Sequence, residues 1–325
     1  MPNEALTVVR TCAICRNAEG NRAVRTREMM FGLGDPFEYL ECAKCGCIQL
    51  LDAPSDWVRY YPPDYYSFRM PHEGPVKRLL KRYRARHALG ARSVPGAVLV
   101  LACGVPPFVI WITPAKLNWD DAILDVGCGS GRILGEMSIA GFSNLTGVDP
   151  YIAADATIGG RVRLLRRHLR GVVGSFDFVM MNQSFEHMDD PETRLMEVAS
   201  LLPVGKMLLL RIPVAGKVAW REYGADWVQL DPPRHLFIHS EESIRILAER
   251  SGFTVQRVQY DSDSFQFWGS EQYRRGIPLQ DARSHAVNPS RSPFLPNQIA
   301  EFERRAKVLN ARGEGDQASF YLVRR

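Results

Sequence analysis

Several features that would assign this chain to a familiar class of protein are absent from its sequence. No cleavable signal peptide is visible at its start, so we expect a cytoplasmic protein. In that reducing compartment the 7 cysteines would not form a disulfide framework. The net charge is only +5 over 325 residues, but basic residues gather in residues 77–86 and 161–170. These clusters suit an anionic partner such as a phosphate, a nucleotide or an acidic lipid, or they are solvated surface.

Charged residues are also missing between residues 93 and 115, which is long enough to span a membrane. Prolines interrupt this stretch, and the basic residues before it would hold its N-terminal side in the cytoplasm and export everything after it. We therefore predict a broken helical lead-in that packs on the sheet. The alternative is that this stretch and the basic helix before it lie on a membrane surface.

Four cysteines form two Cys-x-x-Cys pairs, a spacing typical of a zinc ribbon in which each pair makes a turn and four thiolates surround the metal. The predicted ligands are Cys12, Cys15, Cys42 and Cys45. Cys47 either replaces Cys45 or is a buried thiol. A site with four cysteine ligands has no open position, so we expect structural zinc and short strands at residues 22–27 and 37–40.

A glycine-rich segment follows the apolar run at residues 122–124 and reads Asp-Val-Gly-Cys-Gly-Ser-Gly over residues 125–131. Glycines permit a tight turn between a strand and a helix, and the N–H groups of the helix start face a ligand. The spacing differs from the Gly-x-Gly-x-x-Gly of dinucleotide-binding proteins. A second predicted strand ends at Asp149, whose carboxylate can accept hydrogen bonds from both hydroxyls of a ribose.

This order of residues resembles motif I of the class I S-adenosylmethionine-dependent methyltransferases. The resemblance implies an α/β fold with a seven-stranded doubly wound, Rossmann-like sheet, and predicted strands and helices alternate along the rest of the chain. It also implies that S-adenosylmethionine is bound by Asp125, Gly127, Cys128, Gly129, Gly131, Asp149 and Asn182. The predicted domains are a zinc ribbon at 1–55, an aromatic loop and helical lead-in at 56–117, and a methyltransferase domain at 118–325.

The acceptor side is predicted where the fourth strand ends, at residues 182–188. His187 could take a proton from an acceptor hydroxyl, or it could order the loop through backbone hydrogen bonds. His235 is the second candidate base, while His239 belongs with the start of a helix that Ser240 caps. Substrate contacts are predicted from Glu186 and from Tyr65 and Tyr66 in the aromatic loop. We interpret residues 231–234, Asp-Pro-Pro-Arg, as a loop turn.

The cysteine pairs, tyrosine loop, motif I and the His-containing segments together resemble a bacterial group of methyltransferases with a zinc ribbon, which includes deoxysugar C-methyltransferases. This resemblance implies O- or C-methylation of a small-molecule or glycan acceptor, with a sugar or nucleotide-sugar favoured, and an anionic group on it would suit the arginines. One alternative is an rRNA or tRNA methyltransferase, although aromatic residues are not interleaved with the basic ones as nucleic-acid binding would favour. Another is a non-catalytic cofactor-binding scaffold. The oligomeric state is left open.

Overall fold

The computed structural model describes residues 10–62 and 73–325, so Tyr65 and Tyr66 lie outside the described residues. Its main element is a sheet in the order β11-β12-β9-β8-β4-β5-β7-β6, which confirms the predicted α/β class and adds the short β6 to the seven expected strands. Strands β7, β5, β4, β8 and β9 are parallel, and β12 runs antiparallel between β9 and β11. The strands are β4 (Ala122–Val126), β5 (Asn144–Val148), β6 (Ala156–Ile158), β7 (Val162–Leu165), β8 (Phe178–Asn182), β9 (Met207–Pro213), β11 (Phe253–Tyr260) and β12 (Gln317–Arg324).

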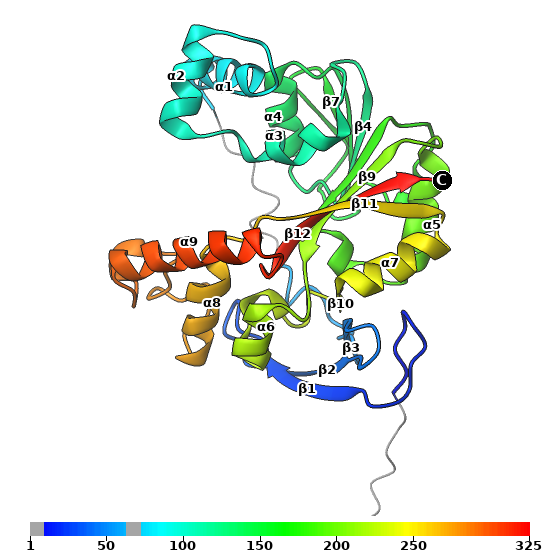
Figure 1. The fold of residues 1–325 in the computed structure, drawn as a ribbon, viewed down its shortest axis with the longest axis vertical. Helices are drawn as coiled ribbons and strands as arrows, with labels where there is room; N and C mark the ends of the chain where they lie inside the picture. The colour runs from blue at the N-terminus through cyan, green and yellow to red at the C-terminus, as the bar shows by residue number, and fades with distance from the viewer. Residues whose placement is uncertain (1–9, 63–72) are drawn as a thin grey trace, which may run out of the picture.

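Helices cover both faces of this sheet because its central strands are apolar on both sides. On one face α1, α3 and α4 pack around a core that includes Phe108, Leu134 and Phe178, and on the other α5 and α7 pack around Val179 and Leu247 (Figure 1). The helices are α1 (Pro75–Ala88), α3 (Pro107–Ile112), α4 (Arg132–Ala140), α5 (Pro191–Leu201) and α7 (Glu241–Arg250). Ser240 caps α7 as predicted, accepting a hydrogen bond from the Ser243 backbone at 3.0 Å.

A second sheet lies beside the carboxyl ends of the parallel strands. Its order is β1-β2-β3-β10, formed by β1 (Arg22–Arg27), β2 (Pro36–Glu41), β3 (Ile48–Leu50) and β10 (Phe237–Ile238). The first three strands come from the N-terminal segment, but β10 follows β9 and α6 (Val218–Tyr223) in the chain. This segment is thus completed by a strand from the region that also holds His235 and His239, which joins it to the main sheet.

Residues between β11 and β12 form α8 (Phe265–Arg274) and α9 (Pro296–Ala311), which the sequence did not lead us to expect. They pack with α6 (Val218–Tyr223) and the small sheet around an aromatic core that includes Tyr39, Trp220, Trp227 and Phe267. In Figure 1 these helices lie at the same end of the molecule as the small sheet. Through this aromatic core the N-terminal strands pack against helices that come much later in the sequence.

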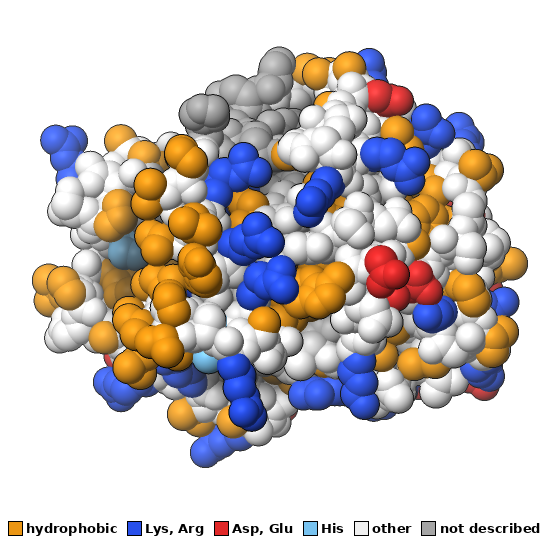
Figure 2. Space-filling view, turned by 90° about the horizontal axis from the view of Figure 1, so that it is seen from above, with side chains coloured by type: hydrophobic (Ala, Val, Ile, Leu, Met, Phe, Trp, Pro, Cys, Tyr) orange, Lys and Arg blue, Asp and Glu red, His pale blue; other side chains and the backbone are white. Residues whose placement is uncertain are grey.

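The uncharged stretch forms two helices with different environments, α2 (Val94–Cys103) and α3. Phe108, Val109 and Ile112 of α3 are buried, as the predicted lead-in requires, whereas in α2 only Gly96 is buried. The prediction that the whole stretch packs on the sheet is therefore wrong for α2, whose side chains contribute to an apolar surface (Figure 2). Among the described residues no single helix is long and apolar enough to cross a membrane. Only α2 and residues 107–115 taken together have that length and hydropathy, and they are bent by 103° relative to each other.

Candidate active site

The glycine-rich turn joins the buried strand β4 to α4 at the carboxyl edge of the sheet. Gly127 and Gly131 have φ of 76° and 74°, a conformation that strains other residues. A Cβ on Gly127 would lie 2.4 Å from the Ser184 Cβ, and one on Gly131 would lie 2.8 Å from the Leu164 Cδ2. The glycines therefore allow the turn to sit against the ends of β8 and β7. Cys128 in the same turn lies against Gly147, and burial raises the pKa of its thiol.

Asp149 lies at the end of β5 beside this turn and is 7% exposed. Its two carboxylate oxygens accept hydrogen bonds from the backbone N–H groups of Gly129 at 3.0 Å and Tyr151 at 2.8 Å. Desolvation raises its pKa, and the two N–H groups oppose that rise. A carboxylate has about four lone-pair sites, so these bonds orient the group and leave one lone pair on each oxygen for a ligand.

Asp125 is a second buried carboxylate, 2% exposed, at the end of β4. Desolvation and the nearby Asp149 raise its pKa to about 7. It makes no hydrogen bond with any of the described residues, so the site offers negative charge to a cationic group. Asn182 ends β8, and its Oδ1 accepts a hydrogen bond from Arg211 at 3.3 Å.

The structure brings Glu186, His187 and His235 together beside the end of β8, where one candidate ligand atom from each lies within 4.8 Å of the others. The two imidazole rings are 4.8 Å apart between centroids, and His235 Nε2 is 4.0 Å from Glu186 Oε1. Glu186 is 1% exposed, and neither carboxylate oxygen has a hydrogen-bond partner among the residues that the structure describes. Desolvation raises its pKa to about 8, so a proton, a cation or a bound hydroxyl would be stabilised here.

Backbone carbonyls determine the tautomers of both histidines. His187 Nδ1 donates to Arg234 O at 2.8 Å, and His235 Nδ1 donates to Gln229 O at 2.7 Å. Since a carbonyl can only accept, each neutral ring carries its lone pair on Nε2. Burial, with His235 nearby, lowers the pKa of His187 to about 3, and burial also lowers that of His235. Both rings are therefore neutral at physiological pH and can accept a proton.

A buried ion-pair network holds the loop that carries these carbonyls. Arg234 is fully buried and bonds Asp231 at 2.6 Å and Glu28 at 2.9 Å through Nη2. Glu28 lies between β1 and β2 and also accepts the backbone N–H groups of Phe31 and Leu33, both at 2.9 Å. Residues 231–234, which we interpreted as a simple loop turn, are thus the link between the small sheet and the histidines.

The four predicted cysteines converge at one end of the small sheet. The Sγ atoms are 3.6 Å apart for Cys12 and Cys45 and 3.4 Å apart for Cys15 and Cys42, and one atom from each of the four lies within 4.8 Å of the rest. Cys47 is outside this cluster and fully buried, with its thiol directed to Ile48 O at 3.8 Å. Of the two open possibilities for Cys47, the structure favours the buried thiol.

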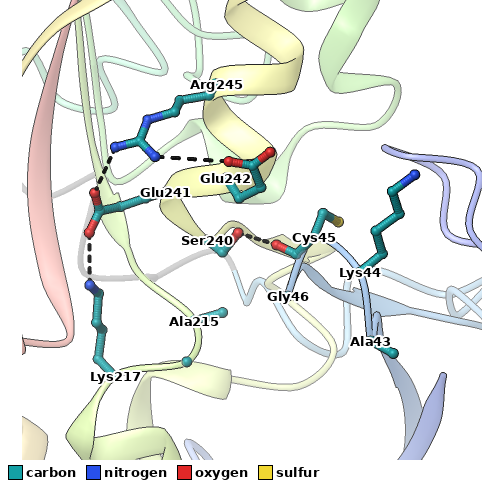
Figure 3. A pocket seen from close by; sticks show the side chains of 11 residues that line it. Ala43, Lys44, Cys45, Gly46, Ala215, Lys217, Ser240, Glu241, Glu242 and Arg245 are labelled. Carbon is teal, nitrogen blue, oxygen red and sulfur yellow. Dashed lines mark hydrogen bonds and ion pairs between the residues drawn. The ribbon is translucent and has the colours of Figure 1, made fainter. Parts of the chain in front are cut away.

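A surface hollow of about 470 Å³ lies elsewhere, between the second cysteine pair and the start of α7 (Figure 3). Four of its five charged side chains pair with one another, since Glu241 bonds Lys217 at 2.8 Å and Arg245 at 3.5 Å, and Arg245 also lies 3.9 Å from Glu242. Ser240 bonds the Cys45 carbonyl in its floor. The hollow is lined by none of the residues 125–131 of the glycine-rich turn, and by neither Asp149, Glu186 nor the two histidines. The candidate site is therefore the one at the strand ends.

The sequence matches the family described as "Methyltransferase domain" over residues 77–258, more than half of the chain. The chain belongs to this methyltransferase family. The match includes the glycine turn, Asp149, Glu186 and both histidines of the pair. Together with the order of the large sheet, it establishes a class I S-adenosylmethionine-dependent methyltransferase fold.

Among solved structures, this methyltransferase is similar to the cyclopropane synthase MmaA2 from Mycobacterium tuberculosis, with a TM-score of 0.45, 15% identity and coverage of 77% of this chain and 99% of that one. It is also similar to the mycolic acid cyclopropane synthase CmaA1 complexed with SAH, with a TM-score of 0.45, 15% identity and coverage of 78% of this chain and 99% of that one. For the YcgJ protein from Bacillus subtilis the TM-score is 0.42 and the identity 16%, with coverage of 67% of this chain and 97% of that one. At these values the likenesses add nothing to the family assignment. No curated protein matches the sequence.

Sequence reasoning missed several residues that lie around the Glu186, His187 and His235 cluster or hold it in place. Tyr61, just before the predicted Tyr65 and Tyr66, places its hydroxyl 3.3 Å from His187 Nδ1. Ser184 Oγ bonds Val126 O at 2.7 Å and so ties the end of β8 to the glycine turn. The aromatic run and the segment after β8 signalled the correct regions of the chain. No local pattern identified Glu28 or Arg234, because their role depends on a contact between distant segments.

Proposed function

We propose that this protein transfers the methyl group of S-adenosylmethionine to an oxygen or a carbanionic carbon of a small-molecule or glycan acceptor, with a sugar or nucleotide-sugar favoured. The observation that carries the proposal is the pair of neutral histidines beside the buried Glu186. Their Nδ1–H groups are held by backbone carbonyls, so both Nε2 lone pairs are available to an acceptor. This arrangement suits removal of a proton from a hydroxyl or an acidic C–H group.

The residues at the glycine turn fit S-adenosylmethionine. Asp149 retains one lone pair on each oxygen for the ribose hydroxyls. Asp125, which has no hydrogen-bond partner in the described part of the chain, suits the ammonium group of the methionine portion. When bound, this compound supplies an electrophilic methyl group on a sulfonium, and S-adenosylhomocysteine is the leaving group. The protein's own contribution is to hold the acceptor in line and exclude water from the reacting groups.

His187 is the proposed base, and His235 is the second candidate. As the new bond to the methyl group forms, the acceptor hydroxyl gives its proton to Nε2 of the base. The low pKa of His187 keeps the imidazole neutral but also makes it a weak base. The charge of the nearby Asp231 opposes this lowering of the pKa and so stabilises the imidazolium. Such a base contributes roughly 10²–10⁴-fold to the rate.

The cysteine cluster fits structural zinc. With Zn–S bonds of about 2.3 Å, a tetrahedral site places its sulfurs about 3.8 Å apart, close to the 3.6 Å and 3.4 Å between paired Sγ atoms. We therefore propose that Cys12, Cys15, Cys42 and Cys45 bind zinc and hold the small sheet in the position from which Glu28 reaches Arg234.

Calorimetry with S-adenosylmethionine and turnover assays test the proposal together. D149A is expected to abolish cofactor binding, and H187A is expected to retain it while losing turnover by about 10²-fold or more. The exposed Asp120 and His168 offer matched controls, D120A and H168A, that should change neither quantity. Normal binding by D149A would overturn the cofactor site, and normal turnover by H187A would overturn the base.

The acceptor is identified by incubating the protein with isotopically labelled S-adenosylmethionine and a cell extract, followed by mass spectrometry. Label in a sugar, a nucleotide-sugar or another small molecule supports the proposal. Label confined to RNA would instead favour the rRNA or tRNA alternative, with binding that weakens steeply as salt rises. Heat of cofactor binding without label in any product would favour the non-catalytic cofactor-binding scaffold.

A further inference from the structure

Helix α2 places an apolar surface outside the protein. It contains no charged residue, and its exposed side chains include Val94 at 79%, Val98 at 60% and Leu101 at 91%. Core helices of globular proteins bury such residues, and single exposed ones are common, but a contiguous group marks a binding surface. The exposure of α2 is therefore a feature of the fold that needs a partner.

The backbone of α2 holds these side chains in place. Gly96 lies so close to α1 that a Cβ there would be 2.5 Å from the His87 Cβ and 2.6 Å from the Tyr83 carbonyl oxygen. At the other end of the helix, Arg84 of α1 donates to the carbonyls of Gly104 at 2.7 Å and Cys103 at 2.5 Å. Because α2 is attached to α1 through its smallest residue and its terminal carbonyls, its aliphatic side chains remain on the outside.

The apolar surface continues onto the neighbouring helices. Its further exposed members, all at least 40% exposed, are Val76, Leu79, Leu80, Tyr83, Val105 and Ile110. Figure 2 looks onto this end of the molecule and shows hydrophobic side chains gathered at one side, with lysine and arginine side chains next to them. Since α2 and the following helix are bent by 103°, this surface lies along the protein and does not form a straight span.

A basic hollow of about 540 Å³ adjoins the apolar surface, between α1, α4 and the residues after β6. Arg78, Arg82 and Arg161 line it, and none of the three has a carboxylate partner among the described residues. The one acid in its lining, Glu73, is neutralised by Lys81 at 2.6 Å and Lys77 at 3.5 Å. Its remaining positive charge suits a phosphate group.

We propose that α1, α2 and α3 dock this protein on an anionic phospholipid membrane. The aliphatic side chains of α2 enter the boundary between headgroups and acyl chains, and the three arginines of the hollow contact lipid phosphates. Apolar side chains beside basic ones are typical of helices that lie in a membrane interface. A second copy of the chain fits less well because a two-fold contact between identical faces would bring these basic residues together. The proposal goes beyond the methyl transfer proposed above and does not depend on it.

The test is sedimentation of the full chain with vesicles of phosphatidylcholine alone or with about one third phosphatidylglycerol. We expect binding to the anionic vesicles, reduced at least about tenfold by the double substitution V98E/L101E, since each side chain loses favourable apolar burial. The matched control V204E/L295E changes the same residue types at positions that are 76% and 63% exposed outside α1–α3, and it should bind like the parent. R78A/R82A should bind the anionic vesicles less than the parent does, close to the level at which the parent binds vesicles of phosphatidylcholine alone.

Cys103 provides a second measurement, because it is exposed at the end of α2. An environment-sensitive fluorophore attached to it should shift to shorter wavelength when anionic vesicles are added. The proposal is overturned if the parent binds neither vesicle, or if V98E/L101E binds as well as V204E/L295E. It is also overturned if the apolar surface instead pairs two copies, seen as a dimer in solution that V98E/L101E dissociates. Calorimetry of each variant with S-adenosylmethionine, done without vesicles, reports separately on the proposed function.

Discussion

The substitution E28Q tests whether the small sheet supports the acceptor side of the methyltransferase. Glu28 is fully buried and accepts three hydrogen bonds of 2.9 Å, from Arg234 and from the backbone of Phe31 and Leu33. A glutamine has one accepting oxygen, so its NH2 group would face an N–H donor, and Arg234 would lose the carboxylate of Glu28 while it keeps that of Asp231. The expected loss of unfolding free energy is about 3–5 kcal/mol, as for removal of one partner from a buried ion pair.

The matched control is E38Q on β2. Glu38 also pairs with arginine, at 2.6 Å from Arg10, but its side chain is 26% exposed, and such pairs contribute about 0–1 kcal/mol. Urea unfolding followed by tryptophan fluorescence gives the change in unfolding free energy for each variant. The change is calculated from the shift in the unfolding midpoint, with the same slope used for all proteins. Because Arg234 O holds His187, E28Q protein that remains folded should lose turnover more than cofactor affinity. If E28Q and E38Q differ by less than about 1 kcal/mol, the network does not stabilise the fold as argued.

Two further predictions concern the metal and the pH dependence of stability. C45S should lose bound zinc by metal analysis, whereas C47S should retain it, and the reverse result would assign the fourth ligand to Cys47. Since the folded pKa of Glu186 is raised to about 8 from an unfolded value of about 4.3, the folded state binds the extra proton between these values. The stability that this proton contributes is full below about pH 4.3 and is lost as pH rises through 8. Because glutamine does not titrate, the thermal stability of E186Q should rise relative to that of the parent over this pH range. Parallel pH profiles of the melting temperature for the two proteins would refute this.

Local patterns were sufficient for much of the fold and for the cofactor side of the site. The apolar run at β4, the glycines and Asp149 are close in sequence, and each strand or helix end is specified by its own residues. The acceptor side was predicted less completely. His187 and His235 were identified as candidates, but their tautomers depend on the carbonyls of Arg234 and Gln229, which only the folded loop places beside them.

The sequence by itself determined the alternation of strands and helices, the glycine-rich turn after β4 and the four cysteines that cluster, because these follow from residue type and short-range spacing. Only the tertiary structure decided that Glu28 meets Arg234, that β10 completes the small sheet and that α2 leaves its aliphatic residues outside. Each of these depends on which surfaces come together after the chain has folded. A buried ion pair between residues 28 and 234, or a helix held by one glycine, has no periodic signature in the sequence.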